Sequence, residues 1–264
     1  MFNPHDPYRA PQEFLDLYPL ESIVLPLNID DDFKDRPFVY KRIADTAFKQ
    51  LGEDGYREAI RHYYASCSYV DSLVGELLAT LEYEGAAENT TVIFLSDHGD
   101  YCGEHGLFCK GIPCYDSAYH IPAIIKSPGR FEQNGVREES LISLTDFAPT
   151  ILELAGVDYR RNRFYGRSLL PLLEGESSGQ HRETIFMQCN GIELYYSQRI
   201  LRTKEWKYVF NGFDRDELYN LKQDPEENHN LAGVVGYAKK IKDLSSLLCR
   251  EPAAVGDGII NGYF

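Results

Sequence analysis

Hydrophobic and polar positions alternate with different periods along the chain. Apolar residues recur at helical spacing over residues 56–83, which predicts a long amphipathic helix. The short apolar run VIFLS at residues 92–96 follows, and it is typical of a central β-strand that is buried on both faces. A second apolar run at residues 121–126, within IPAIIKSPG, predicts a neighbouring strand that stops at a Pro-Gly pair. In the first forty residues the apolar positions show no regular spacing, and proline and acidic residues are frequent. We therefore expect an irregular surface segment there.

The segment SLTDFAPTILELAGV, at residues 143–157, predicts another helix. We expect its N-cap region to include Thr145 and its end to lie at Gly156. A linker or exposed loop is expected at 175–179. Beyond it, four short alternating segments predict an antiparallel sheet: ETIFMQ, ELYYSQRILRT, WKYVFN and DELYNL. A final helix over residues 237–248 is expected to pack on that sheet.

This order of elements predicts the fold class α/β. We expect residues 1–178 to form part of a doubly wound mixed sheet with flanking helices, and residues 179–264 to form a small antiparallel α+β C-terminal subdomain.

The chain has 264 residues and a net charge of −14, which argues against a nucleic-acid partner. The same charge repels anionic substrates at long range, so an anion site must be made locally by a metal, a lysine or backbone amides. No apolar stretch suits a membrane span, and the opening MFNPHDPYRAPQEF does not resemble a signal peptide. The six cysteines form no C-x-x-C pair. The compartment stays open, with a reducing, cytoplasmic one slightly favoured.

The most informative chemistry follows the strand at 92–96. Asp97 and His98 stand directly after it, and Lys110 comes twelve positions after His98. Ligands in open α/β sheets bind just outside the carboxyl ends of the strands. A carboxylate and an imidazole at such a turn suit a divalent cation. From the residues alone, the alternative that Asp97 caps a turn and His98 is only hydrogen-bonded stays open.

Several motifs in one order carry a family resemblance. TTVIFLSDHGDYCGEHGLFCKG resembles the metal-and-lysine segment of the sulfatases, within the alkaline-phosphatase-like superfamily. The similarity extends over nearly the whole chain, through FNPHDPY, YYASCSYVDSLVGELLATLE, IPAIIKSPG, LISLTDFAPTILELAGV, FYGRSLLPLLEG and RILRTKEWKYVFNGFDRDELYNLKQDPEENHNLAG.

The resemblance implies roles for five residues. Asp97 and His98 are expected to bind a divalent metal, usually Ca²⁺ in this family, with Mn²⁺ or Zn²⁺ as alternatives. Lys110 is expected to hold the transferred sulfate and to stabilise charge on the bridging oxygen, a catalytic and substrate-binding role. His5 is expected to protonate the departing alcohol, since a histidine can donate a proton near neutrality. His105 is expected to brace the loop or to bind substrate.

One departure from the family pattern limits these expectations. Sulfatases carry paired aspartates and then a Cys-x-Pro-x-Arg or Ser-x-Pro-x-Arg segment, whose Cys or Ser becomes the formylglycine nucleophile. This sequence has no such segment, and SPGR at residues 127–130 has the wrong spacing. The chain therefore resembles the C-terminal portion of a sulfatase, truncated or split, and we expect it to be inactive alone.

The predicted function is hydrolysis of sulfate esters, by a sulfuric ester hydrolase acting on a small-molecule or carbohydrate sulfate. Two alternatives stay open. The chain could belong to a phosphonate or phosphate ester hydrolase of the same superfamily, because His98 stands where an asparagine is common. It could also be a catalytically incomplete chain that only binds. Self-association, or a partner that supplies the missing N-terminal half, is expected, and a membrane partner is not.

Overall fold

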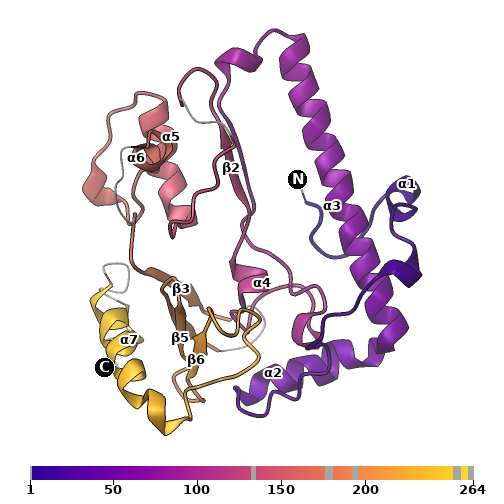
Figure 1. Cartoon of the computed structure of the whole chain (residues 1–264), viewed down its shortest axis with the longest axis vertical. Helices are drawn as coiled ribbons and strands as arrows, with labels where there is room; N and C mark the ends of the chain where they lie inside the picture. Colours follow the sequence, from indigo (N-terminus) through magenta and orange to yellow (C-terminus); the bar gives the residue numbers. More distant parts are fainter. Residues whose placement is uncertain (1, 132–134, 176–180, 192–195, 252–256, 261–264) are drawn as a thin grey trace. The chain divides into compact units, whose positions relative to one another are not determined.

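The computed structural model describes residues 2–131, 135–175, 181–191, 196–251 and 257–260 (Figure 1). Within it the chain forms two compact units, which are taken one at a time below. The first consists of Met1–Lys34 and Phe38–Gly129, and the second of Asp35–Pro37 and Arg130–Phe264. The predicted division between residues 178 and 179 lies outside the described residues and stays a prediction.

A 32-residue helix, α3 (Gly52–Tyr83), is the longest element of the first unit (Figure 1). It confirms the helix predicted over residues 56–83. Two acidic residues in its first turn stabilise the positive end of the helix dipole. Its buried side chains, which include Tyr56 and Ile60, lie in the N-terminal half of the helix. Tyr56 stacks on Phe108 with 5.7 Å between ring centroids, so the helix packs directly against the loop that precedes Lys110.

The other helical segments described in the first unit are short, with three to six residues each. They are α1 (Gln12–Leu15), η1 (Leu20–Ser22), α2 (Phe38–Ile43), η2 (Ala44–Phe48), η3 (Lys49–Leu51), η4 (Ala87–Asn89), η5 (Glu104–Gly106) and α4 (Asp116–Tyr119).

Two strands, β1 (Val92–Leu95) and β2 (Ala123–Lys126), pair antiparallel in the first unit, which confirms that the two predicted strands are neighbours. The prediction that the first is a central strand buried on both faces is wrong. Leu95 is 36% exposed and Ile124 is 62% exposed. The reason is that β2 is the only strand paired with β1 in the described part of the chain. Exposed apolar strand surface of this kind favours association, but self-association stays a prediction.

The second unit begins with a helical part made of η6 (Leu144–Asp146), α5 (Phe147–Leu154), η7 (Arg161–Arg163) and α6 (Leu170–Leu173). Ser143 is the N-cap residue and forms a reciprocal capping box with Asp146. Its side chain accepts from the backbone N–H of Thr145, so the N-cap region includes Thr145 as predicted. The predicted stop is confirmed, because Gly156 adopts a left-handed φ of 67° just after the helix.

The antiparallel sheet predicted near the C-terminus is confirmed. Its strands pair in chain order: β3 (Ile185–Cys189), β4 (Gln198–Arg202), β5 (Trp206–Phe210) and β6 (Glu217–Asn220). After η8 (Val235–Tyr237), the helix α7 (Ala238–Arg250) covers one face of the sheet. Leu244 and Leu248 of α7 pack there against Leu201, Tyr208 and Leu218. Strand β3 has a free edge among the described strands.

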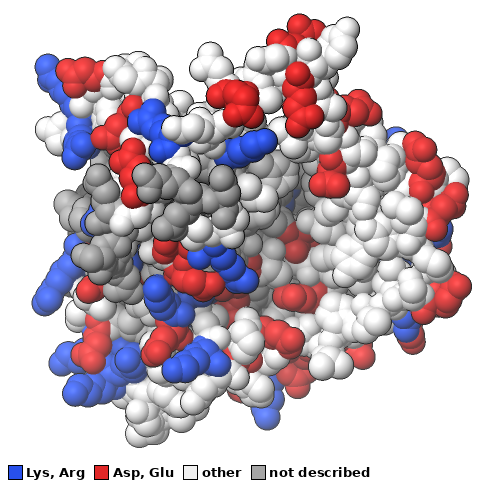
Figure 2. Space-filling view, turned by 45° about the horizontal axis from the view of Figure 1, so that its top comes forward, with Lys and Arg blue, Asp and Glu red and all other residues white. Residues whose placement is uncertain are grey.

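This combination of helices with antiparallel sheets confirms the predicted fold class. Figure 2 shows Asp and Glu spread over the face drawn there, with Lys and Arg in separate groups. All six cysteines are free thiols. In the described residues, the structure offers no helix with both the length and the apolarity to cross a membrane.

Candidate active site

Four of the predicted site residues lie together in the first unit. His5 Nε2 is in hydrogen-bond contact with Lys110 Nζ, although the two residues are 105 positions apart. The His5 ring also stands edge-on to the ring of His98, with 5.6 Å between centroids. Asp97 Oδ2 lies 3.9 Å from His98 Nε2. The N-terminal segment, the turn after β1 and the following loop therefore converge on one cluster.

The hydrogen bonds of His5 fix its tautomer. Its Nδ1 lies 2.8 Å from the carbonyl oxygen of Asp6 and must donate to it. The lone pair of Nε2 then accepts from the Lys110 ammonium. The side chain is 30% exposed, which leaves it accessible to a bound molecule. Nε2 is thus the atom at which His5 can take or give a proton.

Asp97 and His98 have the properties of a metal-binding pair. His98 Nδ1 donates to the carbonyl oxygen of Gly99 at 2.8 Å, so the Nε2 lone pair is free to bind a cation. Burial alone would raise the pKa of Asp97, but His98 and backbone N–H groups hold that pKa below its ordinary value. The carboxylate is therefore ionised at neutral pH.

This pair fits part of a divalent-metal site. A carboxylate oxygen and an imidazole nitrogen are both suitable donors. The described residues contain no group of three or more His, Cys, Asp or Glu side chains that could hold a metal ion. Asp97 and His98 would therefore supply only part of a coordination shell.

Asp100 anchors the loop that carries Lys110. Its Oδ2 accepts from the Tyr8 hydroxyl at 2.7 Å. Its Oδ1 accepts from the backbone N–H groups of Cys102 at 2.8 Å and Cys109 at 3.1 Å. Burial raises the pKa of Asp100, and these hydrogen bonds oppose that rise. One carboxylate thus ties the segment of His5 to both ends of the Lys110 loop, a role that the sequence analysis missed.

We expect Tyr8→Phe to lower the free energy of unfolding by about 1–3 kcal/mol, because it removes a hydrogen bond to a half-buried carboxylate. Urea denaturation of the parent chain and the variant measures this difference. Tyr83→Phe is the matched control, since Tyr83 is 88% exposed. Equal losses of unfolding free energy in the two variants would show that the Tyr8–Asp100 bond does not hold the N-terminal segment that carries His5.

The backbone of this loop is unusually constrained. Three residues other than glycine have left-handed φ values: Cys102 at 48°, His105 at 53° and Cys109 at 64°. Such conformations are costly for L-residues and persist only where the surroundings enforce them. The two bonds to Asp100 do so at Cys102 and Cys109. Gly106 is held close to its neighbours as well, since a Cβ there would come within 2.6 Å of the Ile29 carbonyl oxygen. Lys110 is therefore presented by a well-defined loop.

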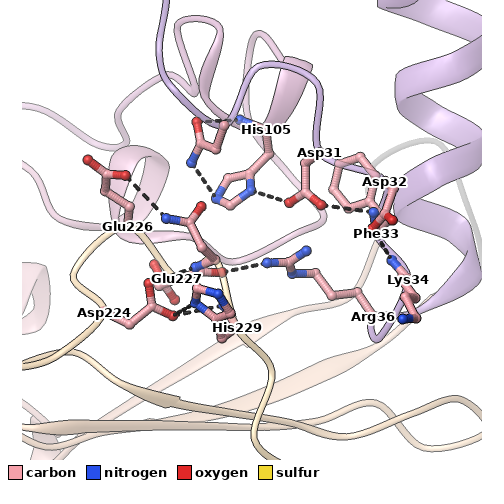
Figure 3. A network of polar contacts seen from close by, with 12 residues as sticks. Asp31, Asp32, Phe33, Lys34, Arg36, His105, Asp224, Glu226, Glu227 and His229 are labelled. Atoms are coloured by element: carbon pink, nitrogen blue, oxygen red, sulfur yellow. Dashed lines mark hydrogen bonds and ion pairs between the residues drawn. The ribbon is translucent and has the colours of Figure 1, made fainter.

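His105 lies in the interior of the first unit and is not part of the His5–Lys110 contact. Its side chain has no exposed surface. Nδ1 lies 2.6 Å from Asp31 Oδ2 (Figure 3). Nε2 lies 3.3 Å from Asn28 Nδ2, and the ring stacks on Tyr115 with 4.0 Å between centroids. A side chain without exposed surface does not line an open pocket in this structure, and the predicted substrate-binding role of His105 stays a prediction. The contacts agree with the other part of the prediction, that His105 braces the loop.

Two family models match the chain. The sulfatase model matches residues 3–157, and the model for the C-terminal part of N-sulphoglucosamine sulphohydrolase matches residues 103–253. The fold and the clustered His, Lys and Asp side chains agree with these matches. The chain belongs to the sulfatase family, which confirms the resemblance drawn from its motifs. Sulfatases in general use a divalent metal and a formylglycine.

Curated relatives are longer than this chain. It is 32% identical to a choline-sulfatase of Rhizobium meliloti over 238 residues, which cover 87% of this chain and 44% of the relative. It is 33% identical to an N-acetylglucosamine-6-O-sulfatase of Bacteroides thetaiotaomicron over 230 residues, which cover 83% of this chain and 40% of the relative. The structure of a phosphonate monoester hydrolase from Silicibacter pomeroyi matches with a TM-score of 0.81 at 25% identity, covering 94% of this chain and 53% of that one. The chain thus spans about half the length of these proteins or less.

Proposed function

We propose that this chain provides part of the active site of a sulfuric ester hydrolase. The observation that carries the proposal is the contact of His5 with Lys110 beside His98, because it joins segments that are far apart in the sequence. A lysine, a histidine and a metal-binding pair in one exposed cluster suit the hydrolysis of an anionic ester. The family membership of the chain supports this choice.

In this proposal Lys110 binds the oxygens of the sulfate group through its ammonium, which stabilises charge that develops on the ester. When the lysine N–H groups turn to the bound anion, the lone pair of His5 Nε2 is released from Lys110 and can take up a proton from solvent. His5 then gives the proton on Nε2 to the departing alcohol oxygen, as a general acid. Its Nδ1–H stays on the Asp6 carbonyl oxygen, which keeps the ring aimed at the cluster.

Asp97 and His98 would hold the divalent metal, for which we propose Ca²⁺, with Mn²⁺ or Zn²⁺ as alternatives. When bound, the metal supplies Lewis-acid polarisation of the ester. Two protein ligands are few for calcium, which takes six to eight oxygens, so we propose that other ligands come from outside this pair.

We further propose that the chain as given does not turn over sulfate esters by itself, because its sequence contains no Cys-x-Pro-x-Arg or Ser-x-Pro-x-Arg segment. Without the formylglycine nucleophile, Lys110 and His5 have no covalent step to assist. A polypeptide that carries the paired aspartates and the formylglycine segment would complete the site.

Hydrolysis of an aryl sulfate by the purified chain tests the proposal. We expect no turnover from the chain alone and restored turnover when a polypeptide with the paired aspartates and a formylglycine is added. The same polypeptide with alanine at the formylglycine position is the control and should restore nothing. Turnover by the chain alone would contradict the proposed role of the missing segment. No turnover in a docked, stoichiometric mixture would contradict the proposed function and favour a chain that only binds.

A phosphonate or phosphate ester hydrolase is the second candidate function. His98 in the metal-binding pair and the similarity to a phosphonate monoester hydrolase favour it. The values of kcat/KM for matched aryl sulfate and aryl phosphonate esters, measured on the completed enzyme, separate the two. We expect sulfate to be preferred. For the alcohol we propose a small molecule or a carbohydrate, because relatives are named for choline and N-acetylglucosamine sulfates.

A further inference from the structure

A pocket of about 560 Å³ in the second unit lies along the edge of β3 with which no described strand pairs. Three successive residues of this strand, Phe186, Met187 and Gln188, all line it. Successive side chains of a strand point to opposite faces of the sheet, so a cavity over one face would contact only alternate residues. Strand β4 occupies one edge of β3. The pocket therefore lies beside the other edge and extends along it.

The backbone of this edge is unpaired among the described residues. Strand β3 pairs with β4 alone, over Ile185–Cys189. In an antiparallel pair, every second residue directs its N–H and C=O groups away from the partner strand. These outward groups of β3 have no backbone partner in the described part of the chain. A row of unpaired N–H and C=O groups is a template to which another extended chain can add.

A loop that is held in place forms another wall of the pocket. Tyr165 and Arg167 of this loop belong to the lining. The backbone N–H of Arg167 donates to the buried carboxylate of Asp146 at 2.8 Å. A Cβ at Gly166 would lie 1.8 Å from the Thr145 carbonyl oxygen, so the loop approaches the helix cap closely. The space is thus bounded by a strand edge and by a constrained loop.

These two walls favour a single extended chain over a second copy of the protein. A strand that pairs with β3 would lie about 4.8 Å from it. In a dimer joined through β3, the β4 strand of the second copy would follow directly behind, toward the side chains of Tyr165 and Arg167. A lone extended segment has no second strand behind it, so it fits the pocket without displacing the loop.

Two buried nitrogen atoms of the lining, Arg182 Nε and His181 Nε2, have no hydrogen-bond partner among the described residues. The two side chains are 10% and 8% exposed. His181 Nε2 lies 3.6 Å from Asp146 Oδ2, which is longer than an ordinary hydrogen bond. Arg182 Nε always carries a hydrogen, and a buried donor without a partner costs free energy that a bound acceptor would recover. A peptide carbonyl oxygen is such an acceptor, and it needs no positive field because it carries no net charge.

The charges of the lining are nearly balanced, with a slight excess of acid. Glu183 and Glu251 stand against Arg167 and Arg182, and the buried carboxylate of Asp146 pairs with Arg182. Glu183 is exposed, and it forms no ion pair with a described residue. A ligand with a basic side chain would therefore complement Glu183, whereas an acidic ligand would gain no attraction.

We propose that this pocket binds an extended, basic segment of a partner polypeptide, which adds to β3 as a further strand of the sheet. Backbone groups of the segment pair with the outward groups of β3, and one of its carbonyl oxygens accepts from Arg182 Nε. An apolar side chain packs between Met187 and Tyr165, which is 69% exposed. A lysine or arginine of the segment pairs with Glu183. This interaction goes beyond the proposed hydrolysis and requires no turnover.

Fluorescence anisotropy of a labelled peptide with the full chain tests the proposal. The probe is an alternating peptide with lysine at both ends, KTVTVTVK, and two derivatives carry N-methyl groups on the valines or on the threonines. Only alternate residues of an added strand direct their N–H groups to β3. We therefore expect one derivative to bind at least about tenfold more weakly than the other.

Two variants locate the peptide in this pocket. Tyr165→Ala should weaken binding about tenfold through the loss of an apolar contact, and Glu183→Gln about threefold through the loss of an exposed ion pair. Tyr83→Ala and Glu88→Gln are the matched controls, because both residues are exposed and lie in the first unit. They should change the affinity less than twofold. Equal melting temperatures will show that the variants are folded.

Equal binding of the two N-methylated derivatives would overturn the proposal, because backbone pairing would then play no part. No binding of the parent peptide, or an unchanged affinity in Tyr165→Ala, would overturn it as well. A dimer in sedimentation that the peptide dissociates would assign the edge to a second copy instead. None of these outcomes depends on turnover, so failure of this proposal is distinguishable from failure of the proposed hydrolysis.

Discussion

Lys110→Met in the completed enzyme is expected to lower kcat/KM for an aryl sulfate by about 10³-fold. Removing one preorganised electrostatic contact to a reacting anion typically costs about 10²–10³-fold in rate. Lys110 also contacts His5 Nε2, so its loss should disturb the proposed proton donor as well. Methionine keeps the unbranched stem, is one heavy atom shorter, and removes the charge and the donors. Steady-state kinetics of the chain with its completing polypeptide measure the effect.

Lys49→Met is the matched control for this experiment. Lys49 lies in η3, its side chain is 72% exposed and its partner is Asp45 on the same helical surface. We expect no more than a twofold change in kcat/KM. A loss of less than tenfold in Lys110→Met would show that this ammonium does not contact the transferred group.

Asp146→Asn is expected to lower the free energy of unfolding of the second unit by about 3 kcal/mol at neutral pH. The carboxylate has no exposed surface and pairs with Arg182, whose side chain is 10% exposed. The substitution leaves that guanidinium buried beside a neutral amide. Urea denaturation, followed by the fluorescence of Trp206 in β5, measures the loss.

The same variant should show a defined pH dependence. Burial would raise the pKa of Asp146, but His181, backbone N–H groups and Arg182 outweigh burial and lower the pKa. The ionised carboxylate therefore adds stability above its unfolded pKa of about 3.9, and this stability is lost as the pH falls through the lower folded pKa. The difference between the parent chain and Asp146→Asn should thus shrink as the pH falls below about 4.

Glu153→Gln serves as the control for both measurements. Its carboxylate pairs with Arg161, which is 81% exposed, so the expected loss is below about 1 kcal/mol. A penalty for Asp146→Asn that stays constant down to acid pH would contradict the ion-pair explanation.

Helices and strands could be predicted from the sequence where the pattern of apolar residues that marks them lies within a short stretch of chain. The apolar period of α3 and the alternation in β3 to β6 are both properties of short windows, and both predictions are confirmed. The burial of β1 could not be predicted in this way. The sequence of a strand records how apolar it is, whereas its burial depends on which strands and helices lie beside it. Leu95 and Ile124 look like core residues in the sequence and are partly exposed in the structure.

The same distinction applies to the candidate site. Lys110 and His98 could be identified because family motifs mark their positions. His105 has the same polar appearance in the sequence, but its partner Asp31 lies 74 positions away, and that pairing accounts for its burial. The bond from Tyr8 to Asp100 and the pairing of Asp146 with Arg182 were also missed, since neither leaves a spacing that a sequence pattern reveals.

The span of the Tyr8–Asp100 bond has a consequence for how the chain folds. This bond joins residues 92 positions apart, while α3, which lies between them, needs only local contacts. Contacts that close long loops form after local ones, because the loss of chain entropy comes before any gain. We therefore expect His5 to join the Lys110 loop late in folding. By the same reasoning, local detachment of the segment around His5 should remove the proposed proton donor while α3 is still intact.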